Sequence, residues 1–372
     1  MHVTQLRLIS FRNYRDQTVT FGSGQNVLYG RNAQGKTNLL EALYILSSAK
    51  SFRQGRERDW IAFGSTSACV IAHFEAYGQS HTIEMRLLAE DGRKQMLVEG
   101  FPIQRNSDLA AVFCTVLFEP GHLGLVKEGP EERRAFLDGA IGQLRPGYHR
   151  ALDDYGRVVA QKNALLRQGG RDDLLAVYNA RQASIGSQLV LLRSSYVKKM
   201  THFASEHHSR LSGGAEQLVI TYETSCGAHE EREAIRDALY AETERRTAEE
   251  RERGMALVGP HRDDLSIRIN GQSARLFGSQ GQQRSVALSM KLAECAMAEA
   301  ALGEPPILLL DDVMSELDAA RRRYLRHQLR DRQVILTTCV PARPGKRTAV
   351  FRVSDGAVTP VTTDPPDEAM DG

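Results

Sequence analysis

The 372-residue chain lacks several features that would assign it to a special class of proteins. Its five cysteines are scattered and odd in number, which argues against a disulfide framework or a zinc site and favours reduced thiols. It has no apolar run of about eighteen residues and no signal peptide, so no membrane span is predicted. The net charge of +2 is too small to indicate nucleic acid binding by itself. We therefore expect a cytoplasmic protein with about two domains.

One stretch carries a specific motif. Residues 30–37 match the phosphate-loop pattern G-x-x-x-x-G-K-[ST], between an apolar strand and a helix-prone run. Glycines let backbone N–H groups approach a phosphate, and the start of the following helix adds its dipole. Lys36 is predicted to reach the β- and γ-phosphates and Thr37 to hold Mg²⁺. The predicted nucleotide contacts of the loop are Gly30, Arg31, Asn32, Ala33, Gln34, Gly35, Lys36, Thr37 and Asn38.

A second motif lies far along the chain. The apolar run 307–310 ends in Asp311 and Asp312. Asp311 suits the Mg²⁺ shell beside a phosphate loop, and Asp312 suits a group that orients or deprotonates the attacking water. We predict Lys36, Asp311 and Asp312 as the catalytic residues. Because most of the chain separates the two motifs, the helical block between them is predicted to be an insertion in one ATPase sheet.

The remaining patterns organise the chain. Alternating runs at 67–76, 80–89 and 95–99 predict an antiparallel β-meander, and 111–118 predicts a buried strand. Helical patterns follow, with breaks at 145–147 and 169–170, and then a charged helix with a solvated face at 229–254. The predicted divisions are an ATPase half at 1–123, a helical lobe at 124–254, a second ATPase half at 255–358 and a disordered acidic tail at 359–372.

Residues 277–294 precede the acid-terminated strand and begin a helix. Ser279 and Gln282 form a capping-box pattern, so an ordinary capped helix is one interpretation. Gly281 and the flanking glutamines favour the other, in which the helix start binds an anion.

Together these motifs resemble ABC-type ATPase heads, and in particular the RecF family of bacterial recombination mediators. The segments that carry this resemblance run in order along nearly the whole chain. They are FRNY at 11–14, GKTNLLEA at 35–42, SFR at 51–53, RRAFLD at 133–138, GPHRDDL at 259–265, FGSQGQQR at 277–284 and LLLDDVMSELD at 308–318. The resemblance implies an α/β fold: an ABC-type P-loop ATPase head with an antiparallel β-meander and an inserted, mainly helical lobe.

The resemblance also implies a function. ATP and Mg²⁺ would be the cofactors, and hydrolysis would be slow and stimulated by DNA. ATP would drive a homodimer in which Ser279, Gly281 and Gln282 of one subunit close on the nucleotide held by Lys36 of the other. The dimer would bind gapped, single- and double-stranded DNA and help RecR and RecO load recombinase. Arg12 and Asn13 would lie near the nucleotide.

Three positions depart from the expected patterns. Ala33 stands where the family usually has glycine, which is a mild change if its φ is negative. Asp312 replaces the glutamate of most ABC heads, which suggests slow turnover. No histidine follows the last apolar run as in transporter-type heads, so Thr337 or Thr338 is predicted to sense the γ-phosphate.

The DNA contacts are left open by the sequence. Candidate clusters are Arg53, Arg56 and Arg58; Arg133 and Arg134; Arg321 to Arg323; and Arg343, Lys346 and Arg347. The polar segment 259–265 is expected near the nucleotide or between lobes. Alternative functions are the head of another chromosome-maintenance complex, the ATPase subunit of a transporter, and a metabolic P-loop kinase.

Overall fold

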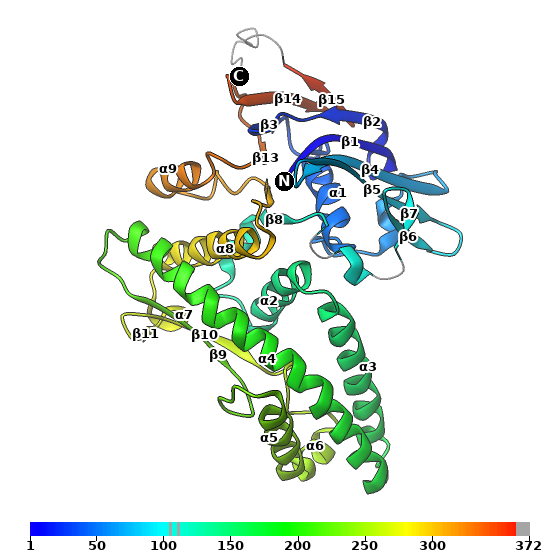
Figure 1. Ribbon diagram of the computed structural model, residues 1–372, viewed down its shortest axis with the longest axis vertical. Helices are drawn as coiled ribbons and strands as arrows, with labels where there is room; N and C mark the ends of the chain where they lie inside the picture. Colours follow the sequence, from blue (N-terminus) through cyan, green and yellow to red (C-terminus); the bar gives the residue numbers. More distant parts are fainter. Residues whose placement is uncertain (104–105, 110–111, 362–372) are drawn as a thin grey trace. The chain divides into compact units, whose positions relative to one another are not determined.

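The computed structural model describes residues 1–103, 106–109 and 112–361, which group by their contacts into two units (Figure 1). The first unit consists of residues 1–122 and of those from 295 on, and the second of residues 123–294. Residues 255–294 thus group with the helical unit, while the four domains predicted from the sequence stay a prediction.

The first unit contains a mostly parallel sheet in the order β15-β14-β3-β13-β12-β8. The five strands from β14 to β8 are parallel, and β15 is an antiparallel edge strand. Parallel strands meet at their carboxyl ends, which places the ends of β3 and β12 on one edge of the sheet. The strands are β3 (Gln25–Tyr29), β8 (Thr115–Phe118), β12 (Ile307–Leu310), β13 (Val334–Thr338), β14 (Thr348–Ser354) and β15 (Ala357–Pro360).

A second, antiparallel sheet of the first unit has the order β2-β1-β4-β5-β6-β7, and it confirms the predicted β-meander. Its strands are β1 (His2–Phe11), β2 (Tyr14–Thr20), β4 (Ser67–Ala76), β5 (Gln79–Leu88), β6 (Lys94–Val98) and β7 (Phe101–Pro102). The helix α1 (Lys36–Ser48) contacts strands of both sheets and is largely buried. The phosphate loop therefore leads into a largely buried helix between the two sheets.

The second unit is mainly helical, as predicted. Its long helices are α2 (Pro130–Leu144), α3 (Tyr148–Arg167) and α4 (Asp172–Leu211), and the predicted breaks fall between them. A small antiparallel sheet, β11-β10-β9, packs against α4. The other elements of this unit are β9 (Leu218–Glu223), α5 (Arg232–Arg245), α6 (Thr247–Arg253), β10 (Asp264–Ile269), β11 (Gln272–Ser273) and α7 (Ala274–Phe277).

The remaining helices are α8 (Gln280–Leu302), which runs from residues of the second unit into residues of the first, and α9 (Ala319–Gln328) in the first unit. Short 3₁₀ helices cover Glu57–Trp60, Asn106–Leu109 and Pro120–Gly124.

Two predicted elements need correction, and one segment cannot be compared. The strand predicted at 111–118 is formed only by Thr115–Phe118, and residue 111 lies outside the described residues. The single charged helix predicted at 229–254 is two helices, because the chain bends at Arg246. Strand β15 extends to Pro360, and residues 362–372 of the predicted tail lie outside the described part.

Candidate nucleotide site

A cavity of about 460 Å³ brings the two distant sequence motifs together in the first unit. Such a volume is within the usual range for small-molecule sites. The phosphate loop and the start of α1 form one wall, and the ends of β12 and β13 form the other. The lining residues are Asn32, Ala33, Gly35, Lys36, Thr37, Asn38, Arg53, Pro120, Asp311, Asp312 and Thr337.

The FRNY segment fixes the shape of the phosphate loop. The Tyr14 hydroxyl donates a hydrogen bond to the Gly35 carbonyl (3.0 Å), and the Asn13 amide donates one to the Gln34 carbonyl (3.0 Å). Gly35 has φ of 113°, and a Cβ there would lie 2.6 Å from the Asn13 side chain. Only glycine fits this position. Asn13 thus holds the loop from behind, and its direct contact with a nucleotide stays a prediction.

Lys36 concentrates positive charge at the loop. Its ammonium donates hydrogen bonds to the carbonyls of Gly30 (2.5 Å) and Arg31 (2.9 Å), and it lies 3.6 Å from Cys339 Sγ. The side chain is 7% exposed. A cation held within a loop of backbone N–H groups is an arrangement that binds phosphate.

Thr37 and Asp311 meet as a metal site requires. The Thr37 hydroxyl donates a hydrogen bond to Asp311 Oδ1 (3.0 Å), although Thr37 lies in the first turn of α1 and Asp311 follows β12. A hydroxyl and a carboxylate are hard oxygen ligands that suit Mg²⁺. The described residues contain no group of three or more His, Cys, Asp or Glu that could hold a metal alone. This fits an ion that completes its shell with water and phosphate oxygens.

Asp312 has an uncommon backbone conformation beside this pair. Its φ is 50°, its carboxylate lines the cavity, and its backbone N–H donates a hydrogen bond to Thr337 Oγ1 (2.9 Å). Thr337 in turn donates to Asp311 Oδ1 (2.8 Å). The Thr338 hydroxyl instead accepts from the Val340 N–H (3.1 Å). Thr337 is therefore the better placed of the two predicted γ-phosphate sensors.

Sequence analysis missed the residue that organises the back of the site, Glu41. It is completely buried in α1, and both of its oxygens accept hydrogen bonds from Arg12 (2.9 and 2.6 Å). Arg53 lies 3.6 Å from the same carboxylate and donates to Asn38 Oδ1 (2.8 Å). An acid within the apolar run 39–46 was the available signal. Arg53, predicted only as a DNA contact, lines the nucleotide cavity.

The expectation for Ala33 needs correction. Its φ is 63°, not negative, so it lies in the left-handed region that favours glycine. An alanine there carries backbone strain of about 1–2 kcal/mol. The substitution of glycine is therefore not mild for this loop.

The start of α8 belongs to the second unit and does not line the cavity. Ser279 and Gln282 form the predicted capping box: the Ser279 N–H donates to Gln282 Oε1 (2.8 Å), and the Gln282 N–H donates to Ser279 Oγ (3.2 Å). Ser279 is exposed and Gly281 is half-buried. The trans contacts of Ser279, Gly281 and Gln282 stay a prediction.

The polar segment 259–265 groups with the second unit by its contacts, and a place near the nucleotide stays a prediction. Asp264 accepts two hydrogen bonds from Arg133 (2.6 and 2.8 Å), and Asp263 accepts one from the Tyr222 hydroxyl (2.6 Å). Arg193 donates to Asp138 Oδ1 (2.7 Å) and to the Pro260 carbonyl (2.6 Å). We call Arg133, Asp138, Arg193, Asp263 and Asp264 the arginine–aspartate cluster.

The prediction that Arg133 contacts DNA is wrong, because this residue is buried in the cluster. Arg133 is 2% exposed, and its guanidinium is occupied by Asp264 and by backbone carbonyls such as that of Glu128 (2.7 Å). It cannot reach a DNA phosphate without unfolding its surroundings. Of the other candidates, Arg134 and Arg321 are half-buried, and Arg134 donates to the Asp263 carbonyl (2.9 Å). The remaining candidates are exposed, and the largest group of exposed arginines on one helix is on α9. The exposed basic residues are Arg56, Arg58, Arg322, Arg323, Arg326, Arg343, Lys346 and Arg347.

Known proteins resemble this chain over nearly its whole length. Residues 2–355 match the family model described as RecF/RecN/SMC N terminal domain. A DNA replication and repair protein RecF from Symbiobacterium thermophilum is 40% identical over 344 residues, which cover 91% of each chain. One from a Synechococcus species is 38% identical over 347 residues, again 91% of each chain.

Solved structures give the same result. The chain superposes on one titled "Structure of the recombination mediator protein RecF-ATPrS in RecFOR pathway" with a TM-score of 0.91, 33% identity and coverage of 97% of this chain and 98% of that one. An Smc head bound to the C-winged helix domain of ScpA gives a TM-score of 0.56 at 16% identity over 97% of each chain, and so shares only the fold. Among the described residues, none of the helices combines the length and apolar character that crossing a bilayer requires.

Proposed function

The chain belongs to the RecF family, and on that premise we propose that it is an ATP-dependent DNA-binding protein of recombinational repair and replication restart. The observation that carries this proposal is the convergence of Lys36, Thr37, Asp311 and Asp312 on one cavity. The solved relatives include RecF with ATP, which supports ATP as the nucleotide.

Each residue of the cavity has a distinct task in this proposal. Lys36 and the loop N–H groups bind the phosphates. Thr37 and Asp311 hold Mg²⁺, which neutralises phosphate charge when it is bound. Asp312 orients the attacking water and accepts its proton. Thr337 of β13 holds both aspartates in place, because its hydroxyl accepts a hydrogen bond from the Asp312 N–H and donates one to Asp311.

We propose that ATP joins two copies of the chain. The exposed start of α8 presents Ser279 and Gly281, and a helix start attracts anions. The preceding Leu276 and Phe277 are 74% and 71% exposed, which is unusual for large apolar side chains and fits an interface. In the dimer, the γ-phosphate would be shared between Lys36 of one subunit and this helix start of the other.

The dimer would bind gapped DNA and single/double-strand junctions, with RecR and RecO as partners in loading recombinase, in the cytoplasm. Arg322, Arg323 and Arg326 of α9 are exposed and form no ion pair within the described part of the chain. We place a main DNA contact there, because each arginine that neutralises a DNA phosphate releases counterions condensed on the DNA. The absence of a base-reading motif in the sequence implies weak sequence preference.

Titration of labelled gapped DNA with ATP or ADP at several salt concentrations tests this function. We expect tight binding only with ATP, and a slope of log affinity against log salt well above one in magnitude, since each phosphate contact contributes about 0.9. Arg322→Glu with Arg323→Glu is expected to lower the magnitude of that slope by the contribution of about two phosphate contacts. Arg236→Glu with Arg245→Glu, on the exposed face of α5, is the control of equal charge. Affinity that ignores nucleotide and salt would overturn the proposal.

A further inference from the structure

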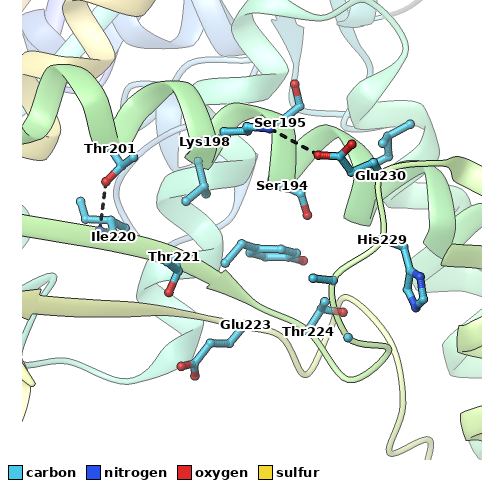
Figure 2. A pocket seen from close by; sticks show the side chains of 15 residues that line it. Ser194, Ser195, Lys198, Thr201, Ile220, Thr221, Glu223, Thr224, His229 and Glu230 are labelled. Carbon is cyan, nitrogen blue, oxygen red and sulfur yellow. Dashed lines mark hydrogen bonds and ion pairs between the residues drawn. The ribbon is translucent and has the colours of Figure 1, made fainter. Parts of the chain in front are cut away.

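A groove of about 730 Å³ lies in the second unit, and none of the predicted nucleotide or DNA contacts lines it (Figure 2). One wall is the middle of α4, the other is the end of β9, and the loop 227–230 closes one end. Ser194 of α4 faces β9 across it. The apolar residues Leu191, Val197 and Ile220 contribute to its lining. The groove is therefore bounded by a helix and by the edge of a sheet.

Strand β9 is an edge strand, because it pairs only with β10 in the sheet. Hydrogen-bonded and non-bonded pairs alternate along an antiparallel ladder. The Asn270 N–H donates to the Gln217 carbonyl (2.9 Å), so Leu218, Ile220 and Tyr222 must direct their backbone groups away from β10. These three residues thus form the outer edge of the sheet.

The helix α4 covers only the first half of this edge. The Ser205 hydroxyl donates to the Leu218 carbonyl (2.6 Å), and the Ile220 N–H donates to Thr201 Oγ1 (3.0 Å), as Figure 2 shows for the second pair. Beyond Thr201, the described structure offers no hydrogen-bond partner to the Ile220 carbonyl or to the Tyr222 N–H and carbonyl. The groove runs along this second half. An open strand edge is a template for another strand.

Charge indicates what kind of strand fits. Glu223 and Glu230 line the groove, and the exposed Glu231 and Glu233 follow in the chain. The only cation within hydrogen-bonding range of Glu230 in the described structure is Lys198 (3.4 Å), and both side chains are more than 80% exposed. So exposed a pair contributes little and is easily replaced. The closed end of the groove therefore attracts a positive charge.

We propose that this groove binds a short extended segment of a partner protein, which adds a strand to the outer edge of β9. The segment pairs with the Ile220 carbonyl and with the N–H and carbonyl of Tyr222. Its apolar side chains face Leu191 and Val197, and a lysine or arginine at one end meets Glu223 and Glu230. The chain's own residues 362–372 are a poor occupant, since they carry four carboxylates and no cation.

Fluorescence anisotropy of the full-length protein with the labelled peptide Thr-Val-Thr-Val-Arg-Lys tests the proposal. Ser194→Trp fills the groove and is expected to weaken binding at least tenfold, about 1.4 kcal/mol. Lys199→Trp places the same bulk on an exposed position of α4 outside the lining and is expected to change nothing. Glu223→Lys with Glu230→Lys is expected to weaken binding about tenfold, and Glu90→Lys with Asp91→Lys, an equal charge change in the other unit, is not.

Two further measurements separate strand addition from other modes of occupancy. The bound peptide should slow hydrogen exchange of the Tyr222 amide, and N-methylation of the paired peptide residues should abolish binding because it removes their N–H donors. Binding without protection of Tyr222, equal binding of the N-methylated peptide, or preferential binding of the acidic peptide 362–372 would each overturn the proposal. Failure of the peptide to bind while ATP-dependent DNA binding persists would refute this inference alone.

Discussion

The nucleotide cavity of the first unit and the arginine–aspartate cluster of the second contain similar charged residues, but only the cavity leaves them open to a ligand. Each region includes a dense polar segment of the sequence, around Lys36 in the cavity and around Asp263 in the cluster. In the cavity, charged groups line an open space of about 460 Å³. In the cluster, Arg133 and Arg193 are each 2% exposed and meet carboxylates and carbonyls of their own chain.

A dense group of polar residues therefore does not by itself indicate a functional site. A buried charge is tolerated when the protein supplies its partners, and it then stabilises the fold only as long as every partner is present. A charge that lines a cavity is available to a ligand. Variants in the first region should therefore change activity at constant stability, and variants in the second should change stability first.

The largest effect is expected for Asp312→Asn, which tests whether a charge lining the cavity serves activity and not stability. Asparagine keeps the shape and tolerates the positive φ of 50° at this position, but it cannot accept a proton. ATP hydrolysis is expected to fall by about 10²–10⁴-fold while ATP binding and melting temperature stay unchanged. Asp312→Gly, which fits the same backbone, is the control for conformation. Hydrolysis at the wild-type rate would show that another group acts as the base.

Glu250→Gln tests whether a buried charge of the second unit contributes to stability. Glu250 and Lys162 form an ion pair at 2.7 Å with each side chain 1% exposed, and the variant leaves Lys162 without its counter-charge. We expect a loss of about 3–5 kcal/mol in the free energy of unfolding, measured with urea. Glu249→Gln removes a neighbouring, one-third exposed carboxylate on the same helix, and we expect a much smaller loss, because exposed ion pairs contribute little. Equal losses of unfolding free energy in the two variants would show that burial does not make the Glu250 charge more important for stability.

Burial of His261 should make the stability of the protein depend on pH. Its Nδ1 bonds to the Tyr155 hydroxyl (2.8 Å) and its Nε2 to the Ala256 carbonyl (3.2 Å), and burial lowers its pKa to about 4. The unfolded chain binds a proton near pH 6.5, which the folded chain does not bind until about pH 4. His261 should therefore destabilise the protein progressively as pH falls from about 6.5 to 4, by about 3 kcal/mol in total.

The measurement for His261 is the stability difference between the protein and His261→Gln over this pH range. Other titrating groups cancel in that difference. A difference that does not change between pH 7 and pH 4 would mean that the imidazole is protonated in the folded state as readily as in the unfolded one.

The smallest effect concerns Ala33→Gly in the phosphate loop. Relief of the strained φ of 63° should stabilise the protein by about 0.5–1 kcal/mol, offset in part by the greater freedom of glycine in the unfolded chain. Ala300→Gly on the exposed surface of α8 should instead destabilise by about 1 kcal/mol. Thermal unfolding of both variants decides whether the loop is strained; destabilisation by Ala33→Gly would contradict it.

The sequence predicted the nucleotide cavity well because its motifs are local. The phosphate loop, the meander and the acid-terminated strand each depend on spacing within a few residues, and the contact between Thr37 and Asp311 follows from parallel strands that end on one edge. The burial of Arg133 could not be read in the same way. Its partner Asp264 lies far along the chain, and nothing local distinguishes it from an exposed arginine. The role of Glu41 was hidden for the same reason, since Arg12 approaches it from the turn between β1 and β2.

The trans assembly of the nucleotide site is the central claim, and mass measurement by light scattering tests it most directly. We predict a monomer near 41.4 kDa with ADP and a dimer of about twice that mass with ATP, most clearly in Asp312→Asn, which should hold ATP longer. Ser279→Arg should remain monomeric while it still binds ATP, and Lys36→Met should neither bind ATP tightly nor dimerise. Equal masses in ATP and ADP, or an ATP-driven dimer of Ser279→Arg, would contradict the account.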